Sequence, residues 1–360
     1  MPWIVPFLFG LAYLLLTALC VYNVYNGYVD AMKCDTRRIT NMLGRVPEDW
    51  AAFLRPSLDV GLPSLMLLAV TVVPFKLVVV VLFHIAGVVG LYTLPTNIFL
   101  PLLSFFCNVF LKFLGITVRE KGERLPSTDT PTIVPNHVSY FDILVMLSRS
   151  HPVSFVAKKA VAAYPVIGDI ATSLGSVYVD RTKDPEERDQ TMDIIEKKQR
   201  SVMEGRSRYQ LCVFAEGTTS NGTCLMHYHD GAFDSMLPVQ PVYLEYSDLR
   251  LSFTCFDLLP HFFLVMALPP WRTITCTLHW LPKVTPSAGS TVRDFSGKAR
   301  DEVAKAGGLR LDNSSNLKGH YEITDFFYGD AAKVATGKLR QEAALERKSS
   351  CNSAETSASD

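Results

Sequence analysis

The stretch that decides the fold is Thr-Ile-Val-Pro-Asn-His-Val-Ser-Tyr-Phe-Asp at 132–142. A short β-branched run ends at a proline and an asparagine, and an apolar helical pattern begins directly after it. His137 therefore lies at a strand-to-helix junction, at the edge of an α/β sheet where active sites collect. A histidine held by a carboxylate such as Asp142 can take a proton from an alcohol near neutral pH. The junction is therefore a candidate site for transfer to a hydroxyl group.

The spacing of this pair carries little weight alone. A histidine followed five positions later by an aspartate occurs three times, at His137/Asp142, His229/Asp234 and His320/Asp325. His229 lies in a polar turn and His320 in a polar tail, so neither has the strand-to-helix context. We expect these two pairs to be accidental, and replacement of either histidine by alanine to leave most turnover.

A second signal is Phe-Ala-Glu-Gly-Thr at 214–218, where an apolar strand ends in a carboxylate and a glycine. Gly217 permits a tight turn and close approach of a substrate. With both motifs placed, the chain resembles the glycerolipid acyltransferase superfamily over residues 119–310. Four blocks occur in the family's order, at 136–142, 175–181, 214–218 and 237–242.

The resemblance implies transfer of an acyl group from acyl-CoA, as co-substrate, to the free hydroxyl of a lysophospholipid. No other cofactor and no catalytic metal are implied. His137 would be the general base, and Asp142 would fix its tautomer. Binding of the acceptor head group and of phosphates is expected from Glu216, Gly217, Thr218, Arg181 and the pair Lys158 and Lys159.

Residues 216–222 and 239–242 are most similar to the branch that acylates lysophosphatidylcholine and lysophosphatidylethanolamine. Lysophosphatidic acid acyltransferases usually carry arginine after Glu-Gly-Thr, where this chain has Thr219. A second departure is Ala215, where the family usually has proline. Three alternatives stay open: acylation of lysophosphatidic acid, CoA-independent transacylation, and a non-enzymatic membrane protein that binds lysolipid.

Composition favours a membrane-associated protein, because 48% of the 360 residues are hydrophobic and only 19% are charged. The 35 basic and 35 acidic residues balance, so no global field recruits nucleic acid. Eight scattered cysteines indicate reduced thiols rather than a disulfide framework. Asn221-Gly222-Thr223 matches the glycosylation pattern, but a glycan inside the proposed site would be disruptive, so we expect a chance match.

Residues 1–118 predict an α-helical membrane anchor. Residues 3–22 form one apolar run of the roughly 20 residues that a span requires. Residues 60–118 form a second apolar region, long enough for a span or a two-helix hairpin, with a break near Pro74 that lets Lys76 reach an interface. Basic residues follow this region directly, which indicates that the catalytic domain faces the cytosol. The lipid chemistry favours the endoplasmic reticulum.

Residues 119–310 alternate short strands and helices, which predicts an α/β fold with a mixed sheet flanked by helices. The expected strands lie at 131–135, 152–156, 176–180, 210–214, 238–244 and 272–280, with the clearest helices at 184–204 and 295–306. The apolar run 258–268 is too short to span a membrane. It could dock on the membrane, line an acyl channel or pack in the core. Residues 311–360 are expected to be a polar, partly disordered tail.

Overall fold

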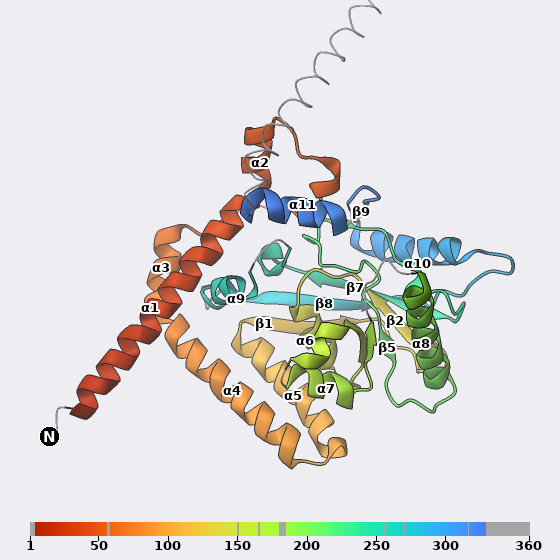
Figure 1. The fold of residues 1–360 in the computed structure, drawn as a ribbon, viewed down its shortest axis with the longest axis horizontal. Helices are drawn as coiled ribbons and strands as arrows, with labels where there is room; N and C mark the ends of the chain where they lie inside the picture. Colours follow the sequence, from red (N-terminus) through yellow and green to blue (C-terminus); the bar gives the residue numbers. More distant parts are fainter. Residues whose placement is uncertain are drawn as a thin grey trace, which may run out of the picture.

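The computed structural model describes residues 4–55, 58–149, 151–164, 166–179, 185–254, 257–269, 271–315 and 317–328. In these residues a mixed sheet lies at the centre, with strand order β1-β8-β7-β2-β5-β3-β4 (Figure 1). Its strands are β1 (Ile116–Lys121), β2 (Thr132–Pro135), β3 (Ser154–Lys158), β4 (Val177–Val179), β5 (Leu211–Cys212), β7 (Val239–Tyr246) and β8 (Ile274–Trp280). The predicted fold class is confirmed, and each of the six expected strands has its counterpart.

Strand directions bring several chain segments to one edge of the sheet. Strands β7, β2, β5, β3 and β4 run parallel to one another, whereas β8 is antiparallel to β7 and β1 is parallel to β8. The carboxyl ends of β2, β5, β3 and β4 therefore share an edge, which is where open α/β sheets bind ligands.

Alternating side chains of the sheet pack against two different layers of helices. Ile133 and Cys212 belong to a core shared with α5 (Thr96–Phe113) and α6 (Phe141–Leu147). Val134 and Leu211 belong to a second core, shared with α8 (Pro185–Met203) and α10 (Val292–Gly307). The two predicted helices at 184–204 and 295–306 are thus α8 and α10.

Strand β1 was not expected, and its first residues lie inside the apolar region predicted for the membrane anchor. It begins at Ile116, directly after α5, and pairs along its whole length with β8. Ile116 and Val118 continue the apolar run, and the charged Arg119 and Lys121 obscure the alternation of a strand. The sheet therefore begins three residues before the predicted boundary.

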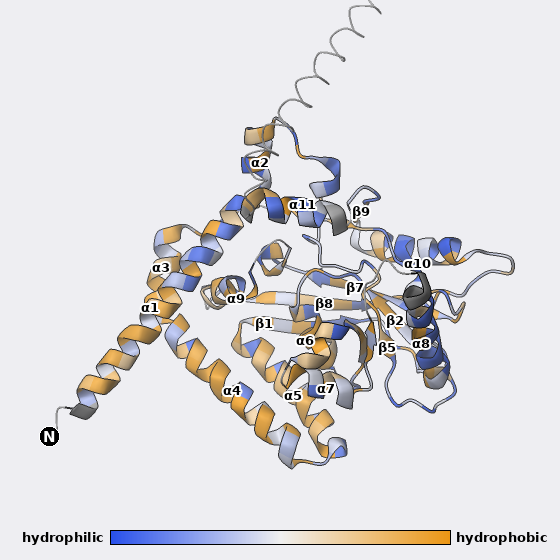
Figure 2. Ribbon diagram, in the orientation of Figure 1, coloured by the Kyte–Doolittle hydropathy of each residue, from blue (hydrophilic) through white to orange (hydrophobic). Residues whose placement is uncertain are grey.

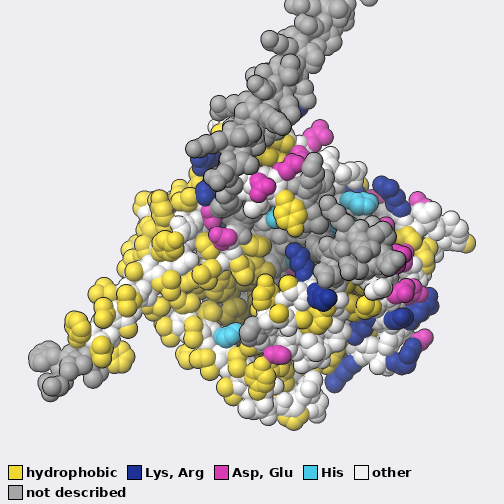
Figure 3. Space-filling model, viewed as in Figure 1, with side chains coloured by type: hydrophobic (Ala, Val, Ile, Leu, Met, Phe, Trp, Pro, Cys, Tyr) yellow, Lys and Arg dark blue, Asp and Glu magenta, His cyan; other side chains and the backbone are white. Residues whose placement is uncertain are grey.

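Three helices are long and apolar enough to cross a membrane: Pro6–Lys33, Val73–Thr93 and Thr96–Phe113. They belong to α1 (Ile4–Lys33), α4 (Val73–Thr93) and α5, which are largely orange in Figure 2. Figure 3 shows hydrophobic side chains gathered over the α1 and α4 side of the molecule, and Lys and Arg gathered over the α8 side. The predicted apolar anchor is therefore helical, and the molecule has one apolar and one charged side.

Helix α1 is longer than the apolar run 3–22, because its second half packs on α9 (Leu258–Met266). A Cβ added at Gly27 would overlap the carbonyl oxygen of Pro260. Helix α9 occupies most of the predicted run 258–268. His261 and Phe263 on α9 are buried, whereas Leu258 is exposed. Core packing is therefore the main role of this run.

A break occurs near Pro74, as predicted: α3 (Leu62–Thr71) ends and α4 begins at Val73. The expectation that Lys76 reaches an interface is wrong. Its side chain is buried, and Nζ donates a hydrogen bond of 2.9 Å to the carbonyl oxygen of Met266. That carbonyl belongs to the last turn of α9, where helix carbonyls lack internal partners and the helix dipole favours a cation.

Both ends of α4 touch the sheet domain. Lys76, near the first turn of α4, binds α9. The hydroxyl of Tyr92, near the last turn of α4, donates to Asp169 of α7 (Ile167–Ser173) over 2.6 Å. Helix α5 then returns beside α6 to β1. The α4–α5 hairpin therefore lies along the domain (Figure 1).

The segment that follows α1 meets α11 on the far side of the sheet from this hairpin (Figure 1). The remaining elements are α2 (Thr36–Leu43), β6 (Cys224–Leu225), β9 (Arg310–Leu311), α11 (Leu317–Tyr328) and the short helices η1 (Glu48–Trp50), η2 (Lys159–Ala163), η3 (Asp230–Ala232) and η4 (Leu249–Leu251). Strand β6 pairs with β9, and the rings of Trp50 and Phe326 join η1 to α11 with centroids 5.2 Å apart.

Candidate active site

The turn after β2 places His137 at the shared edge of the sheet. Pro135 ends the strand, since proline has no N–H for the ladder. The side chain of Asn136 then replaces the backbone as the partner of β7: Leu244 N–H donates to Oδ1 over 2.7 Å, and Nδ2 donates to the Leu244 carbonyl over 3.3 Å. This side-chain bridge fixes the direction in which the chain leaves the sheet towards His137.

His137 and Asp142 are in contact, as their spacing and context predicted. The distance from His137 Nδ1 to Asp142 Oδ2 is 2.8 Å. The backbone N–H groups of Val138 and Ser139 donate to the same oxygen over 2.7 and 2.9 Å, and the Tyr246 hydroxyl donates to Oδ1 over 2.5 Å. Asp142 is fully buried, so these donors offset the cost of taking the carboxylate out of water.

The face of the imidazole ring is covered by an aromatic side chain that the sequence analysis did not single out. The rings of His137 and Phe214 are stacked, with centroids 4.0 Å apart and an interplanar angle of 18°. Phe214 is the residue two positions before Glu216, so the second motif supplies the stacking partner of the first. The His137 side chain keeps 16% of its surface exposed, which leaves an edge of the ring open to a substrate.

Glu216 connects the two motifs through backbone hydrogen bonds. Its Oε1 accepts from His137 N–H over 2.8 Å, and its Oε2 accepts from Met226 N–H over 3.0 Å. Burial raises the pKa of this carboxyl to about 8, although both backbone hydrogen bonds act in the opposite direction. The residue is 3% exposed, which fits shaping of the site better than contact with a head group.

Gly217 forms the tight turn predicted for it. Its φ is 74°, and a Cβ at this position would lie 2.7 Å from Cδ2 of His229. His229, expected to be incidental, therefore lies directly against the turn. The Gly217 N–H donates to the Phe214 carbonyl over 3.0 Å, and Ser220 N–H donates to the His137 carbonyl over 2.8 Å. These bonds hold the segment with Thr218 beside His137.

The remaining predicted residues have a looser relation to the site. Lys158 ends β3 and Lys159 begins η2, so both lie at the shared edge and both are exposed. Arg181 lies outside the described residues. His320, in α11, has Nε2 2.7 Å from the carbonyl oxygen of Thr254. Within the part of the chain that the structure describes, no cluster of three His, Cys, Asp or Glu side chains could hold a metal ion.

Asn221 is a structural residue, which agrees with the expected chance match to the glycosylation pattern. Its side chain is buried, and Nδ2 donates to the carbonyl oxygens of Ala51 and Leu54 over 2.8 and 2.6 Å. The loop after Gly217 is thereby tied to the segment that follows the first helices. A glycan has no room at this amide.

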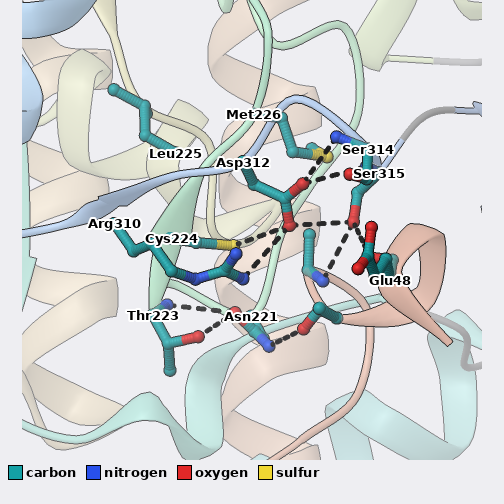
Figure 4. A network of polar contacts seen from close by, with 12 residues as sticks. Glu48, Asn221, Thr223, Cys224, Leu225, Met226, Arg310, Asp312, Ser314 and Ser315 are labelled. Atoms are coloured by element: carbon teal, nitrogen blue, oxygen red, sulfur yellow. Dashed lines mark hydrogen bonds and ion pairs between the residues drawn. The ribbon is translucent and has the colours of Figure 1, made fainter. Parts of the chain in front are cut away.

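A polar network extends this connection to the C-terminal part of the chain (Figure 4). Asp312 Oδ1 accepts from the N–H groups of Ser314 and Ser315 over 2.9 Å, and Oδ2 accepts from the Ser315 hydroxyl over 3.0 Å. The Ser315 hydroxyl oxygen in turn accepts from Ala52 N–H over 3.3 Å. We call residues 48–55, 221–226 and 310–315 the clasp. No sequence signal pointed to it, because its three segments are far apart in the chain.

The fold and the site define a class of protein: an α/β domain with a histidine–aspartate pair at the carboxyl edge of parallel strands. Comparison with known proteins shows which family this segment resembles. Residues 116–245 match the family model described as Acyltransferase, and this segment contains His137, Asp142 and Glu216. The match agrees with the resemblance to acyltransferases that the sequence motifs predicted.

Several relatives carry more specific names. The chain is 39% identical over 145 residues to the lysophospholipid acyltransferase LPEAT1 of Arabidopsis thaliana, covering 39% of this chain and 36% of that protein. It is 32% identical over 206 residues to the lysophosphatidylcholine acyltransferase of Drosophila melanogaster, covering 55% of this chain and 37% of that protein. The chain thus spans little more than a third of the length of these curated relatives.

A solved structure is also similar. It is the 1-acyl-sn-glycerophosphate (LPA) acyltransferase PlsC from Thermotoga maritima, with 17% identity and a TM-score of 0.47. The similarity covers 65% of this chain and 95% of that chain.

Proposed function

We propose that the protein is a membrane-bound lysophospholipid O-acyltransferase that uses acyl-CoA as the acyl donor. The observation that carries the proposal is the 2.8 Å contact between His137 and the buried carboxylate of Asp142, within a segment that matches the acyltransferase family model. A pair of this kind can remove the proton of a lipid hydroxyl group near neutral pH.

In the proposed reaction Asp142 accepts a hydrogen bond from Nδ1–H of His137, so Nε2 is the nitrogen that acts as base. Nε2 takes the proton of the lysophospholipid hydroxyl as its oxygen attacks the thioester carbonyl carbon. The tetrahedral intermediate collapses by breaking the carbon–sulfur bond, and the leaving thiolate takes the proton back from the imidazolium. The products are the diacyl phospholipid and CoA. Base catalysis of this kind contributes about 10²–10⁴-fold.

The proposed acceptors are lysophosphatidylcholine and lysophosphatidylethanolamine. Two observations support this choice over lysophosphatidic acid. Thr219 stands where an arginine would bind a bare phosphate, and the similar proteins of Arabidopsis and Drosophila are named for lysophospholipid and lysophosphatidylcholine acylation. Lys158, Lys159 and Arg181 are proposed to bind phosphate groups of the substrates.

The test is acyl transfer by membranes that contain the wild-type protein, its His137→Ala variant or a His151→Ala control. Labelled oleoyl-CoA is offered with each of three acceptors: lysophosphatidylcholine, lysophosphatidylethanolamine and lysophosphatidic acid. His151 is an exposed histidine of the same domain, so its loss should leave turnover unchanged. We expect product with one of the first two acceptors, and a loss of at least about 100-fold in His137→Ala.

Three outcomes would contradict parts of the proposal. Equal turnover in wild type and His137→Ala would remove His137 as the base. Product with lysophosphatidic acid alone would reassign the acceptor. Transfer between phospholipids that ignores added acyl-CoA would identify a transacylase instead.

A further inference from the structure

The carboxylate behind His137 has a partner that belongs to neither sequence motif. Tyr246, the last residue of β7, donates its hydroxyl hydrogen to Asp142 Oδ1 over 2.5 Å, while Oδ2 faces His137. Tyr246 is 8% exposed and lies in the core shared with α6, the helix that carries Asp142. One carboxylate therefore bridges a histidine on one side and a phenol on the other.

We propose that Tyr246 is a positioning residue that holds the Asp142 carboxylate in place and limits how strongly it attracts the proton of His137. The proposal rests on the proposed function, in which His137 is the base. Tyr246 itself touches no substrate atom in this proposal. It acts through Asp142, and its effect is to keep His137 in the unprotonated form that the reaction requires.

The sheet explains why a residue of β7 reaches this site. Strand β7 lies directly beside β2 with Pro135 opposite Val242, so its last residues extend past the end of β2 into the region of the turn. Tyr246 also pairs with Cys276 of β8, which fixes its backbone from the other side. The Tyr246 hydroxyl is thus positioned by paired strands and not by a loop, as a preorganised site requires.

Among the groups around Asp142, the Tyr246 phenol is the donor that a substitution can remove. Burial, followed by the nearby Asp142 charge, raises the pKa of Tyr246 far above its ordinary value, so the phenol keeps its proton. Burial also raises the pKa of the Cys212 and Cys276 thiols, which stay neutral. Glu216 is a further ionisable neighbour, with a pKa of about 8. The other partners of Asp142 are the His137 ring and the backbone N–H groups of Val138 and Ser139, which remain when a tyrosine is replaced by phenylalanine.

The sign of the effect follows from charge. A hydrogen bond from Tyr246 withdraws negative charge from the carboxylate and so weakens its stabilisation of the imidazolium. Without the hydroxyl, Asp142 attracts the His137 proton more strongly, and a higher pH is needed to reach the unprotonated base. A hydrogen bond to a charged group is strong enough to move this titration by about 0.5–1 pH unit.

The experiment compares wild type, Tyr246→Phe and Tyr243→Phe. Tyr243 lies on the same strand but in the opposite core, so Tyr243→Phe removes the same atom without touching Asp142. We expect the acidic limb of the pH profile of kcat/KM to move to higher pH in Tyr246→Phe by about 0.5–1 unit, with KM for both substrates unchanged. Tyr243→Phe should match wild type. An acidic limb that stays in place in Tyr246→Phe would overturn the proposal.

A second measurement does not depend on turnover. The His137 ring is titrated by NMR in protein carrying labelled histidine, with the signal assigned by its loss in His137→Ala. Its midpoint should rise in Tyr246→Phe by the same amount. Incorporation of 3-fluorotyrosine at position 246, whose phenol is a stronger hydrogen-bond donor, should leave the fold unchanged and lower the midpoint of the His137 titration. Equal midpoints in all three proteins would refute the role of Tyr246, whereas a shifted midpoint without acyl transfer would refute only the proposed reaction.

Discussion

At the scale of single residues, Asp142 is held in place before any substrate arrives. Two backbone N–H groups, one hydroxyl and one imidazole surround a carboxylate with no exposed surface. Such preorganisation means that the histidine keeps one tautomer and one orientation, so little reorganisation remains for the reaction itself.

Asp142→Asn should lower kcat by about 10³–10⁴-fold, because an amide neither fixes the reactive tautomer of His137 nor stabilises its imidazolium. The KM for acyl-CoA should change little, since no substrate contact is removed. The matched control is Asp234→Asn, which neutralises the exposed aspartate of a His/Asp pair that we expect to be accidental. Steady-state kinetics check the prediction, and similar kcat values for the two variants would contradict it.

Glu216 should make the folded protein less stable as the pH rises. Its pKa is about 8 in the folded chain against an ordinary value of 4.5, so between these values the folded chain keeps a proton that the unfolded chain has released. Stability falls with pH wherever the folded state binds more protons. In Glu216→Gln this decline between about pH 5 and 8 should disappear.

Thermal unfolding of the detergent-solubilised protein over this pH range measures the effect. Glu123→Gln, at an exposed carboxylate, serves as the control and should retain the wild-type decline. A Glu216→Gln protein with the same pH dependence as wild type would show that this carboxyl is ionised throughout.

At the scale of elements, α1 combines an apolar first half with a second half that packs on the sheet domain. The backbone of Gly27 makes the close approach to α9, whereas a Cβ added at Gly10 on the same helix would have no atom within 4 Å among the described residues. Two glycines of one helix thus differ only in their surroundings, and they provide an internal comparison.

Gly27→Ala should destabilise the protein by about 1–3 kcal/mol, because the added methyl group would overlap the Pro260 carbonyl and force α1 away from α9. Gly10→Ala should be neutral or slightly stabilising, since alanine favours the helix. Thermal unfolding in detergent compares the two variants. Equal midpoints would mean that α1 and α9 do not pack as closely as the structure has them.

The sequence predicted those elements whose pattern is local. Each expected strand has its counterpart, and the contact of His137 with Asp142 follows from one strand, one turn and one helix. Strand β1 was missed because charged residues interrupt its alternation, and the buried position of Lys76 was missed because its partner lies on α9, 190 residues away in the chain. Phe214 and Tyr246 were missed for the same reason: their partners are distant in sequence.

At the scale of the whole molecule, the α4–α5 hairpin lies along the sheet domain instead of pointing away from it. Lys76 and Tyr92, near opposite ends of α4, both bind the sheet domain, and this favours an α4 that stays on the same side of the membrane as the domain. The hairpin therefore fits a position within one leaflet, with its apolar outer face towards lipid.

We expect Asn97→Cys, at the turn of the hairpin, and Lys298→Cys, on α10, to react with a membrane-impermeant maleimide from the same side of sealed vesicles. Both positions are exposed, and the described native cysteines are buried, so background labelling should be low. Labelling of Asn97→Cys only after the vesicles are opened, with Lys298→Cys labelled beforehand, would show instead that α4 and α5 cross the bilayer.

The clasp has a consequence for the order in which the protein is made. Loop 221–226, which holds Glu216 through Met226, gains its last partners only from Arg310 to Ser315, far beyond the family segment 116–245. During translation the apolar helices and the His137/Asp142 turn emerge first, but the loop beside them stays incomplete until residue 315 has left the ribosome. We therefore expect the apolar helices of a nascent chain to be available to a membrane before the candidate site is assembled.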